Sequence, residues 1–168
     1  MSRSLLTCGL LLATGSILCA EQPSASSKIP RPIDIDLETR DGVILKATYY
    51  PSTLGKEAVP ILMVHEFEGS RSDFAPLALV LQGLGHAALT LDLRGHGEST
   101  FRRGSAQPLN VKQFTSRQFQ LMIWEDMERG KRFLLDKNNE GEVNIEKLCV
   151  IGAGMGATLA LAWTLLDW

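Results

Sequence analysis

The pattern of apolar and polar residues predicts a run of strands that starts near residue 33. Residues 33–37 alternate apolar and acidic side chains, which is typical of a half-buried strand. An Asp-Gly turn at residues 41–42 leads to a partner strand over residues 43–50. The apolar runs at residues 61–64 and 87–93 are continuous, which predicts strands that are buried on both faces.

Helical periodicity appears between these strands. Residues 74–84 repeat apolar side chains at helical spacing through Phe74, Leu77, Ala78 and Leu81, and glycines end the pattern. After a polar segment at residues 95–113, a second helix is predicted from about Phe114 or Gln118 to Leu135. Because strands alternate with helices, we expect an α/β domain with a mainly parallel sheet.

A strand, a sharp turn and a helix are predicted at residues 148–168. The apolar run at 148–151 breaks at the sequence GAGMG, and an Ala- and Leu-rich segment follows at helical spacing. The nucleophile elbow G-x-S-x-G of the α/β hydrolases has this shape. The dinucleotide turn G-x-G-x-x-G/A has it too, and Gly152, Gly154 and Ala157 fit that pattern. As an elbow, the turn carries Gly154 where a serine should stand.

Three motifs in a fixed order resemble the α/β-hydrolase family. Residues 64–69 (VHEFEG) resemble the HG-type loop that follows a buried strand, and residues 92–99 (DLRGHGES) are similar to the D-x-R-G-H-G-x-S segment after the next strand. The GAGMG turn follows at the family's spacing. The resemblance extends from about Ile33 to Trp168 and implies an α/β-hydrolase-like, mainly parallel sheet that stops after the elbow helix. The turn residues of these motifs are His65, Gly69, Asp92, Arg94, Gly95, His96, Gly97, Ser99, Gly152 and Gly156.

The resemblance implies an ester or amide hydrolase as the parent scaffold, and it allows each catalytic position to be checked. Such a site needs a nucleophile, a histidine base, an acid and two backbone N–H groups for the oxyanion. By position, the N–H groups would be those of Phe67 and Met155, but Gly154 has no side chain that could attack a substrate. Glu66 replaces the usual glycine after the histidine, and an inward carboxylate would oppose an oxyanion. The family's acid and histidine follow the nucleophile, and no histidine follows Gly154 here, so we expect a catalytically inactive pseudoenzyme.

The remaining histidines and serines have structural interpretations. His65 and His96 belong to turn motifs and are expected to hydrogen-bond their loops, whereas His86 is expected at the surface. Ser99 belongs to a turn, and Ser70 is expected to cap the helix that starts near Phe74. No histidine pair has metal-ligand spacing, so neither a metal nor a cofactor is expected.

Two alternatives to an inactive hydrolase stay open. One is a non-catalytic binding or structural module on the hydrolase scaffold. The other is a dinucleotide-binding protein that would admit a pyrophosphate through Gly152, Gly154 and Ala157. That hypothesis needs an acidic residue at the end of a following strand, and Asp167 lies on a predicted helix instead.

Composition and the first twenty residues bear on location and partners. The net charge of -2 is too small to indicate a nucleic-acid partner. Residues 1–20 combine Arg3, an uncharged apolar run and a small residue at Ala20, which predicts a cleaved signal peptide and export to the periplasm or medium. The alternative is a membrane anchor, but the run is about fifteen residues, short of the roughly twenty of a membrane span. We therefore favour a cleaved signal over an anchor and expect no stable span after cleavage. Residues 21–32 indicate a flexible spacer, and residues 33–168 the partial hydrolase-like domain.

The end of the chain raises a question of assembly. In the family a further parallel strand lies beside the strand at residues 148–151, so here that strand is expected at an open, apolar sheet edge. Either the sequence is a fragment of a longer protein, which we favour, or the edge is covered by self-association or another partner. Cys149, the one cysteine left after cleavage, is expected to be a small buried hydrophobe in this strand.

Overall fold

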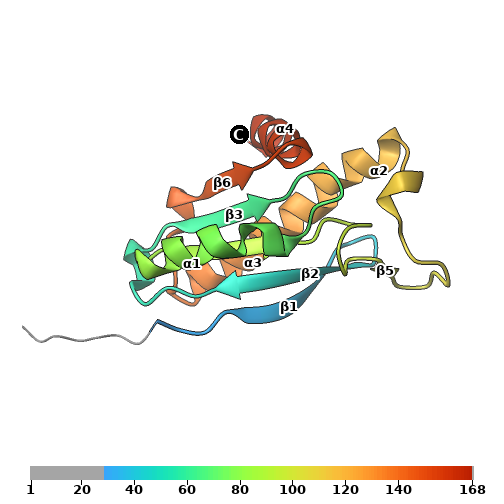
Figure 1. Cartoon of the computed structure of the whole chain (residues 1–168). Helices are drawn as coiled ribbons and strands as arrows, with labels where there is room; N and C mark the ends of the chain where they lie inside the picture. The colour runs from blue at the N-terminus through green and yellow to red at the C-terminus, as the bar shows by residue number, and fades with distance from the viewer. Residues whose placement is uncertain (1–28, 168) are drawn as a thin grey trace, which may run out of the picture.

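Six strands form one mixed sheet in the computed structural model, which describes residues 29–167 (Figure 1). The signal peptide and most of the spacer predicted above lie outside the described residues. The order along the sheet is β1-β2-β4-β3-β6, and β5 pairs with β2. The strands are β1 (Ile33–Glu38), β2 (Val43–Tyr50), β3 (Pro60–Val64), β4 (Ala87–Leu91), β5 (Phe101–Arg102) and β6 (Cys149–Gly152).

Strand direction divides the sheet into two parts. The hairpin of β1 and β2 is antiparallel, and β2 also runs antiparallel to β4. In contrast, β4, β3 and β6 are mutually parallel neighbours. The carboxyl ends of these three strands therefore meet at one edge of the sheet, where the three sequence motifs follow them.

Helices cover both faces of the parallel strands. The longer helices are α1 (Ala75–Gly83), α2 (Ser116–Leu121), α3 (Glu128–Asn139) and α4 (Met155–Asp167), with a π-helical segment, η4 (Met122–Met127), joining α2 to α3. Short 3₁₀ turns lie at η1 (Gly55–Glu57), η2 (Arg71–Phe74), η3 (Val111–Gln113) and η5 (Ile145–Lys147). No helix between residues 29 and 167 combines the length and the apolar character that a membrane span needs.

The alternation of side chains along each strand divides the core into two clusters. On one face, Ile61 and Met63 of β3 pack with Ala78 of α1. On the other face, Leu62 of β3 packs in a cluster with Leu134 of α3 and with side chains of η4 and α4. Every residue of β3 and β4 is buried, as their continuous apolar runs predicted.

The sequence placed most elements correctly and missed several details. The strand predicted at residues 87–93 ends at Leu91, and the helix predicted to end at Leu135 continues to Asn139. An unpredicted π-helical segment, Met122–Met127, interrupts that helix nearer its start. Strand β5 was not predicted. The final helix begins at Met155, before the predicted residue 157.

Two burial predictions were wrong. Leu77 was expected on the buried face of the first helix, but it is 40% exposed, and Ala78 and Gln82 are the buried residues of α1. Cys149 was expected inside the core, but it is exposed because it begins a strand that has a neighbour on one side only among the described residues.

Candidate functional site

The turn between β6 and α4 has the geometry of a nucleophile elbow. Gly154 adopts a φ of +50°, in the left-handed region that side-chain-bearing residues rarely occupy. Its flanking glycines allow close packing: a Cβ at Gly156 would lie 2.2 Å from the carbonyl oxygen of Val64, and one at Gly152 would lie 2.5 Å from the backbone nitrogen of Ala157. The helix can therefore start directly against the end of β3.

Glu66 lies where a side chain at residue 154 would project. An ideal Cβ built on Gly154 would be 2.8 Å from Cβ of Glu66 and 3.0 Å from its carboxylate Oε2. The glutamate follows β3, whereas the glycine follows β6, so the contact joins two loops at neighbouring strand ends. A serine side chain at this turn would have to displace Glu66.

Phe67 and Met155 carry the two N–H groups assigned by position to an oxyanion site. Phe67 lies in a tight turn in which the N–H of Gly69 donates to the carbonyl of Glu66 at 3.0 Å. Met155 is the first residue of α4, where backbone N–H groups have no helical acceptor. Within residues 29–167, neither N–H donates a hydrogen bond.

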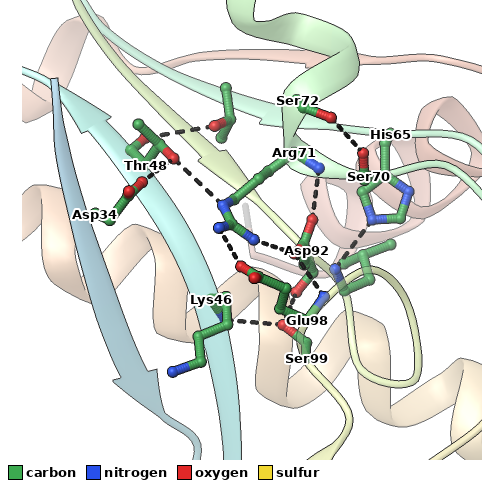
Figure 2. Close-up of polar contacts among 12 residues, drawn as sticks. Asp34, Lys46, Thr48, His65, Ser70, Arg71, Ser72, Asp92, Glu98 and Ser99 are labelled. Carbon is green, nitrogen blue, oxygen red and sulfur yellow. Dashed lines mark hydrogen bonds and ion pairs between the residues drawn. The ribbon is translucent and has the colours of Figure 1, made fainter.

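His65 and His96 hydrogen-bond the backbone of the motif loops. Nδ1 of His65 donates to the carbonyl of Glu66 at 2.7 Å, and its Nε2 accepts from the N–H of Leu93 at 3.1 Å, which assigns a neutral ring (Figure 2). Nδ1 of His96 donates to the carbonyl of Arg94 at 3.1 Å, and the two rings lie 4.9 Å apart. Burial lowers the pKa of both histidines.

Asp92 organises the loop after β4 (Figure 2). Its buried carboxylate accepts the backbone N–H of Arg71 at 2.6 Å and that of Glu98 at 2.9 Å, and it forms an ion pair with the Arg71 guanidinium. Gly97 has a φ of +48°, and a Cβ there would lie 2.4 Å from a carboxylate oxygen of Asp92. The glycine of the motif is therefore required by the aspartate that precedes it.

Ser99 and Ser70 hold turns, as expected for each of them. Ser99 is fully buried, its hydroxyl donates to the carbonyl of Asp92 at 2.7 Å, and it accepts the N–H of Lys46 at 2.8 Å. Ser70 begins η2 in a capping box with Asp73, immediately before α1. Each hydroxyl therefore stabilises a turn.

Arg94 connects its loop to two distant elements. Its guanidinium pairs with Asp126 of the π-helical segment at 2.8 Å and with Asp41 of the β1–β2 turn at 2.8 Å, and all but 3% of the arginine is buried. The backbone N–H of Arg94 also donates to Asp126 at 2.9 Å. Burial raises the pKa of Asp126 to about 6, against the opposing charge of Arg94.

Sequence reasoning missed Asp126, and the residue carries one readable signal. Asp126 is an acidic residue between Trp124 and Met127 in the predicted second helix. It contacts Arg94, which lies 32 positions earlier in the sequence. No local pattern identifies that partner.

His86, expected at the surface, is partly buried where α1 meets β4, and its Nδ1 has no hydrogen-bond partner in the described part of the chain.

The structure thus gathers the three motif loops and gives no metal cluster. The loops at residues 65–69, 92–99 and 152–156 follow β3, β4 and β6, which lie side by side in parallel. Across residues 29–167, no group of three or more His, Cys, Asp or Glu side chains is arranged to hold a metal ion.

No family model matches this sequence. Among curated proteins, two uncharacterised proteins of Mycobacterium tuberculosis, from strains CDC 1551 / Oshkosh and ATCC 25618 / H37Rv, are each 43% identical over 75 residues. The match covers 45% of this chain and only 27% of either relative.

Solved structures share the fold over most of this chain. An acetyl xylan esterase from Paenibacillus sp. R4 aligns with a TM-score of 0.65 and 23% identity, over 86% of this chain and 48% of that one. An α/β hydrolase from Penicillium sp. sh18 aligns with a TM-score of 0.62 and 18% identity, over 82% and 43%. A Pyrococcus furiosus esterase aligns with a TM-score of 0.59 and 24% identity, over 79% and 46%.

These similarities define the class. The protein has an α/β-hydrolase-like fold, as the three motifs predicted. The chain spans less than half the length of each of the three solved structures compared above.

Proposed function

We propose that this chain is an α/β-hydrolase-like protein without serine-hydrolase activity, derived from an ester or amide hydrolase scaffold. The observation that carries the proposal is Gly154, which holds the elbow conformation at φ +50° and offers no atom for attack on a carbonyl. The contact with Glu66 adds a steric reason, because that side chain lies where a Cβ at residue 154 would project.

Electrostatics also oppose hydrolysis at this turn. A tetrahedral intermediate would place negative charge near the N–H groups of Phe67 and Met155, and the Glu66 carboxylate lies over the same turn. Like charges that lie close together repel each other, so the carboxylate would destabilise an oxyanion at this turn.

A non-catalytic binding module is the second candidate, and the intact motif turns favour it. Asp92 and Arg94 keep full sets of partners although the nucleophile is missing, so the loops at the carboxyl ends of the strands stay ordered. Dinucleotide binding is disfavoured by the same structure. The Glu66 carboxylate over Gly154 would repel a pyrophosphate at the start of α4.

The test is labelling of the full chain with a fluorophosphonate probe, together with turnover of activated esters. We expect neither in the natural sequence. Gly154→Ser alone should stay unlabelled, because Glu66 crowds the new side chain and His65 and His96 are held in their loops. Glu66→Gly in the same background should relieve the crowding without producing turnover, and Glu68→Gly is the matched control. Covalent labelling of the natural chain, or turnover lost on changing the 152–156 turn, would overturn the proposal.

We also propose that the protein is exported, on the strength of Arg3, the uncharged run at residues 5–19 and the small Ala20.

A further inference from the structure

The loop that begins at β5 leaves the core and returns to it between two anchored ends. Residues 101–108 are all exposed. At the base of the loop, the N–H of Leu109 donates to the carbonyl of Thr100 at 2.8 Å, which holds the two ends side by side. Beyond the base, Val111 is buried, and its N–H donates to the carbonyl of Gly95 at 3.3 Å.

This loop lies away from β6. Strand β5 pairs with β2, and β4 and β3 lie between β2 and β6 in the sheet. Figure 1 shows β5 beside the start of β2, with β6 across the sheet. The exposure of the loop therefore does not depend on a strand that would lie beside β6.

A pair of arginines, Arg102 and Arg103, lies in this loop directly before Gly104. Gly104 has a φ of +77°, and no atom lies near the position of a Cβ there. The guanidinium of Arg103 pairs with Glu38 at 2.7 Å, but both side chains are exposed, and such a surface pair is weak. Exposed loops of small and polar residues are preferred sites of proteolytic cleavage. Proteases of the trypsin type recognise a basic residue before the cleaved bond through a carboxylate in their specificity pocket.

Backbone hydrogen bonds distinguish the two peptide bonds that follow an arginine. The bond between Arg102 and Arg103 is held on both sides: the carbonyl of Arg102 accepts from the N–H of Ser105 at 3.1 Å. The N–H of Arg103 donates to the carbonyl of Gly42 at 2.7 Å. In the described part of the chain, neither the carbonyl of Arg103 nor the N–H of Gly104 makes a backbone hydrogen bond. The bond between Arg103 and Gly104 is therefore the easier one to draw into a protease.

We propose that the Arg103–Gly104 bond is a processing site for a trypsin-like protease. Water adds to the carbonyl carbon of Arg103 and the C–N bond to Gly104 breaks, which leaves a carboxylate on Arg103 and an ammonium group on Gly104. The two parts stay folded together, because β6 of the second part pairs with β3 of the first. The buried ion pair of Arg94 with Asp126, at 2.8 Å, also joins them.

A second basic pair in the chain provides the matched control. Lys131 and Arg132 lie within α3, and Arg132 pairs with Glu128 one turn earlier. Helix α3 packs on the sheet through Leu134, so it would have to unwind and leave the core before a protease could bind this pair in an extended form. The two pairs are alike in sequence, and the fold exposes only the first of them in a loop.

Limited digestion of the full chain with trypsin, followed by mass spectrometry, tests the site. Within residues 29–167, the first cut should fall between Arg103 and Gly104, and the two parts should coelute in gel filtration with the circular dichroism of the intact chain. The variant R102Q/R103Q should slow the first cut by about tenfold or more, because the next bond becomes accessible only when an element unfolds. The control K131Q/R132Q should leave the rate unchanged, and Arg103→Lys should still be cut, since trypsin accepts either basic side chain.

Three results would overturn the proposal. They are a first cut at any other bond between residues 29 and 167, equal rates of cutting in R102Q/R103Q and K131Q/R132Q, and separation of the two parts in gel filtration without denaturant. Circular dichroism before digestion confirms that each variant is folded. If the double variant R102Q/R103Q does not fold, Arg103→Gln alone replaces it, because that change removes one exposed ion pair.

Discussion

At the scale of single residues, Gly154 and Glu66 depend on each other. A side chain at residue 154 would require both a left-handed backbone and the space that Glu66 fills. Position 154 is therefore restricted twice, once by its own dihedral angle and once by a residue 88 positions earlier.

The first residue-scale prediction separates these two restrictions. Gly154→Ala should lower the free energy of unfolding by about 1–2 kcal/mol for the left-handed backbone, with a further cost for the contact with Glu66. Gly104→Ala is the matched control, because Gly104 has a φ of +77° and open space around it. Chemical denaturation should show the larger loss at residue 154, and Glu66→Gly should remove the difference. Equal losses in the two single variants would contradict the contact.

A second prediction concerns pH. Burial lowers the pKa of His65 and His96, so the unfolded chain takes up protons near pH 6.5 while the native chain does not. The unfolded state then binds more protons, and stability falls as the pH decreases from about 7.5 to about 6. Each histidine contributes at most about 1.4 kcal/mol per pH unit.

Urea denaturation at several pH values checks this slope. Below about pH 6 the fall should flatten, since burial raises the pKa of Asp126 to about 6 and its native form takes up a proton there. His96→Asn should reduce the slope between pH 7.5 and 6, and a stability that rises on acidification in that range would refute the assignment of neutral rings.

At the scale of elements, the π-helical segment η4 connects the helices to the motif loop after β4. It carries Asp126, which is completely buried, to the guanidinium of Arg94. A π-turn changes the direction in which successive side chains project, and such turns are frequent at functionally constrained positions. The ion pair therefore fixes the Arg94–Ser99 loop to the helical layer.

The element-scale prediction follows from this contact. Asp126→Ala leaves a buried guanidinium with Asp41 as its one remaining carboxylate, and breaking a buried pair in this way costs about 3–5 kcal/mol. A thermal or urea melt should show this loss. Glu125→Ala, the adjacent residue that pairs with the exposed Arg40, should have a much smaller effect. Similar effects for the two variants would show that the Arg94 pair does not support the fold.

At the scale of the whole molecule, helices α1 and α4 each leave large apolar side chains exposed. Helix α1 exposes Leu79 and Val80, and α4 exposes Leu161 and Leu165. These two surfaces lie on opposite faces of the sheet, because α4 packs in the cluster with α3 and α1 packs in the other cluster (Figure 1).

The whole-molecule prediction is export. Mass spectrometry of the protein recovered from its native host should give an N-terminus near Glu21, because Leu18-Cys19-Ala20 places a small residue before the expected cleavage point. Arg3→Glu, which removes the positive charge of the signal, should cause the precursor to accumulate in the cytoplasm. A chain that keeps Met1 in a soluble cytoplasmic fraction would contradict export.

The sequence by itself determined the order of the main elements, the hydrolase-like motifs and the glycine-rich turn at residues 152–156. These properties are local: an apolar run predicts a buried strand, and a glycine between other glycines predicts a sharp turn. Tertiary structure decided the contacts between segments. It placed Glu66 against Gly154, joined Arg94 to Asp126 and left Cys149 exposed, where the sequence had predicted burial. These outcomes depend on which strands are neighbours in the sheet, and periodicity within one segment carries no information about its neighbours.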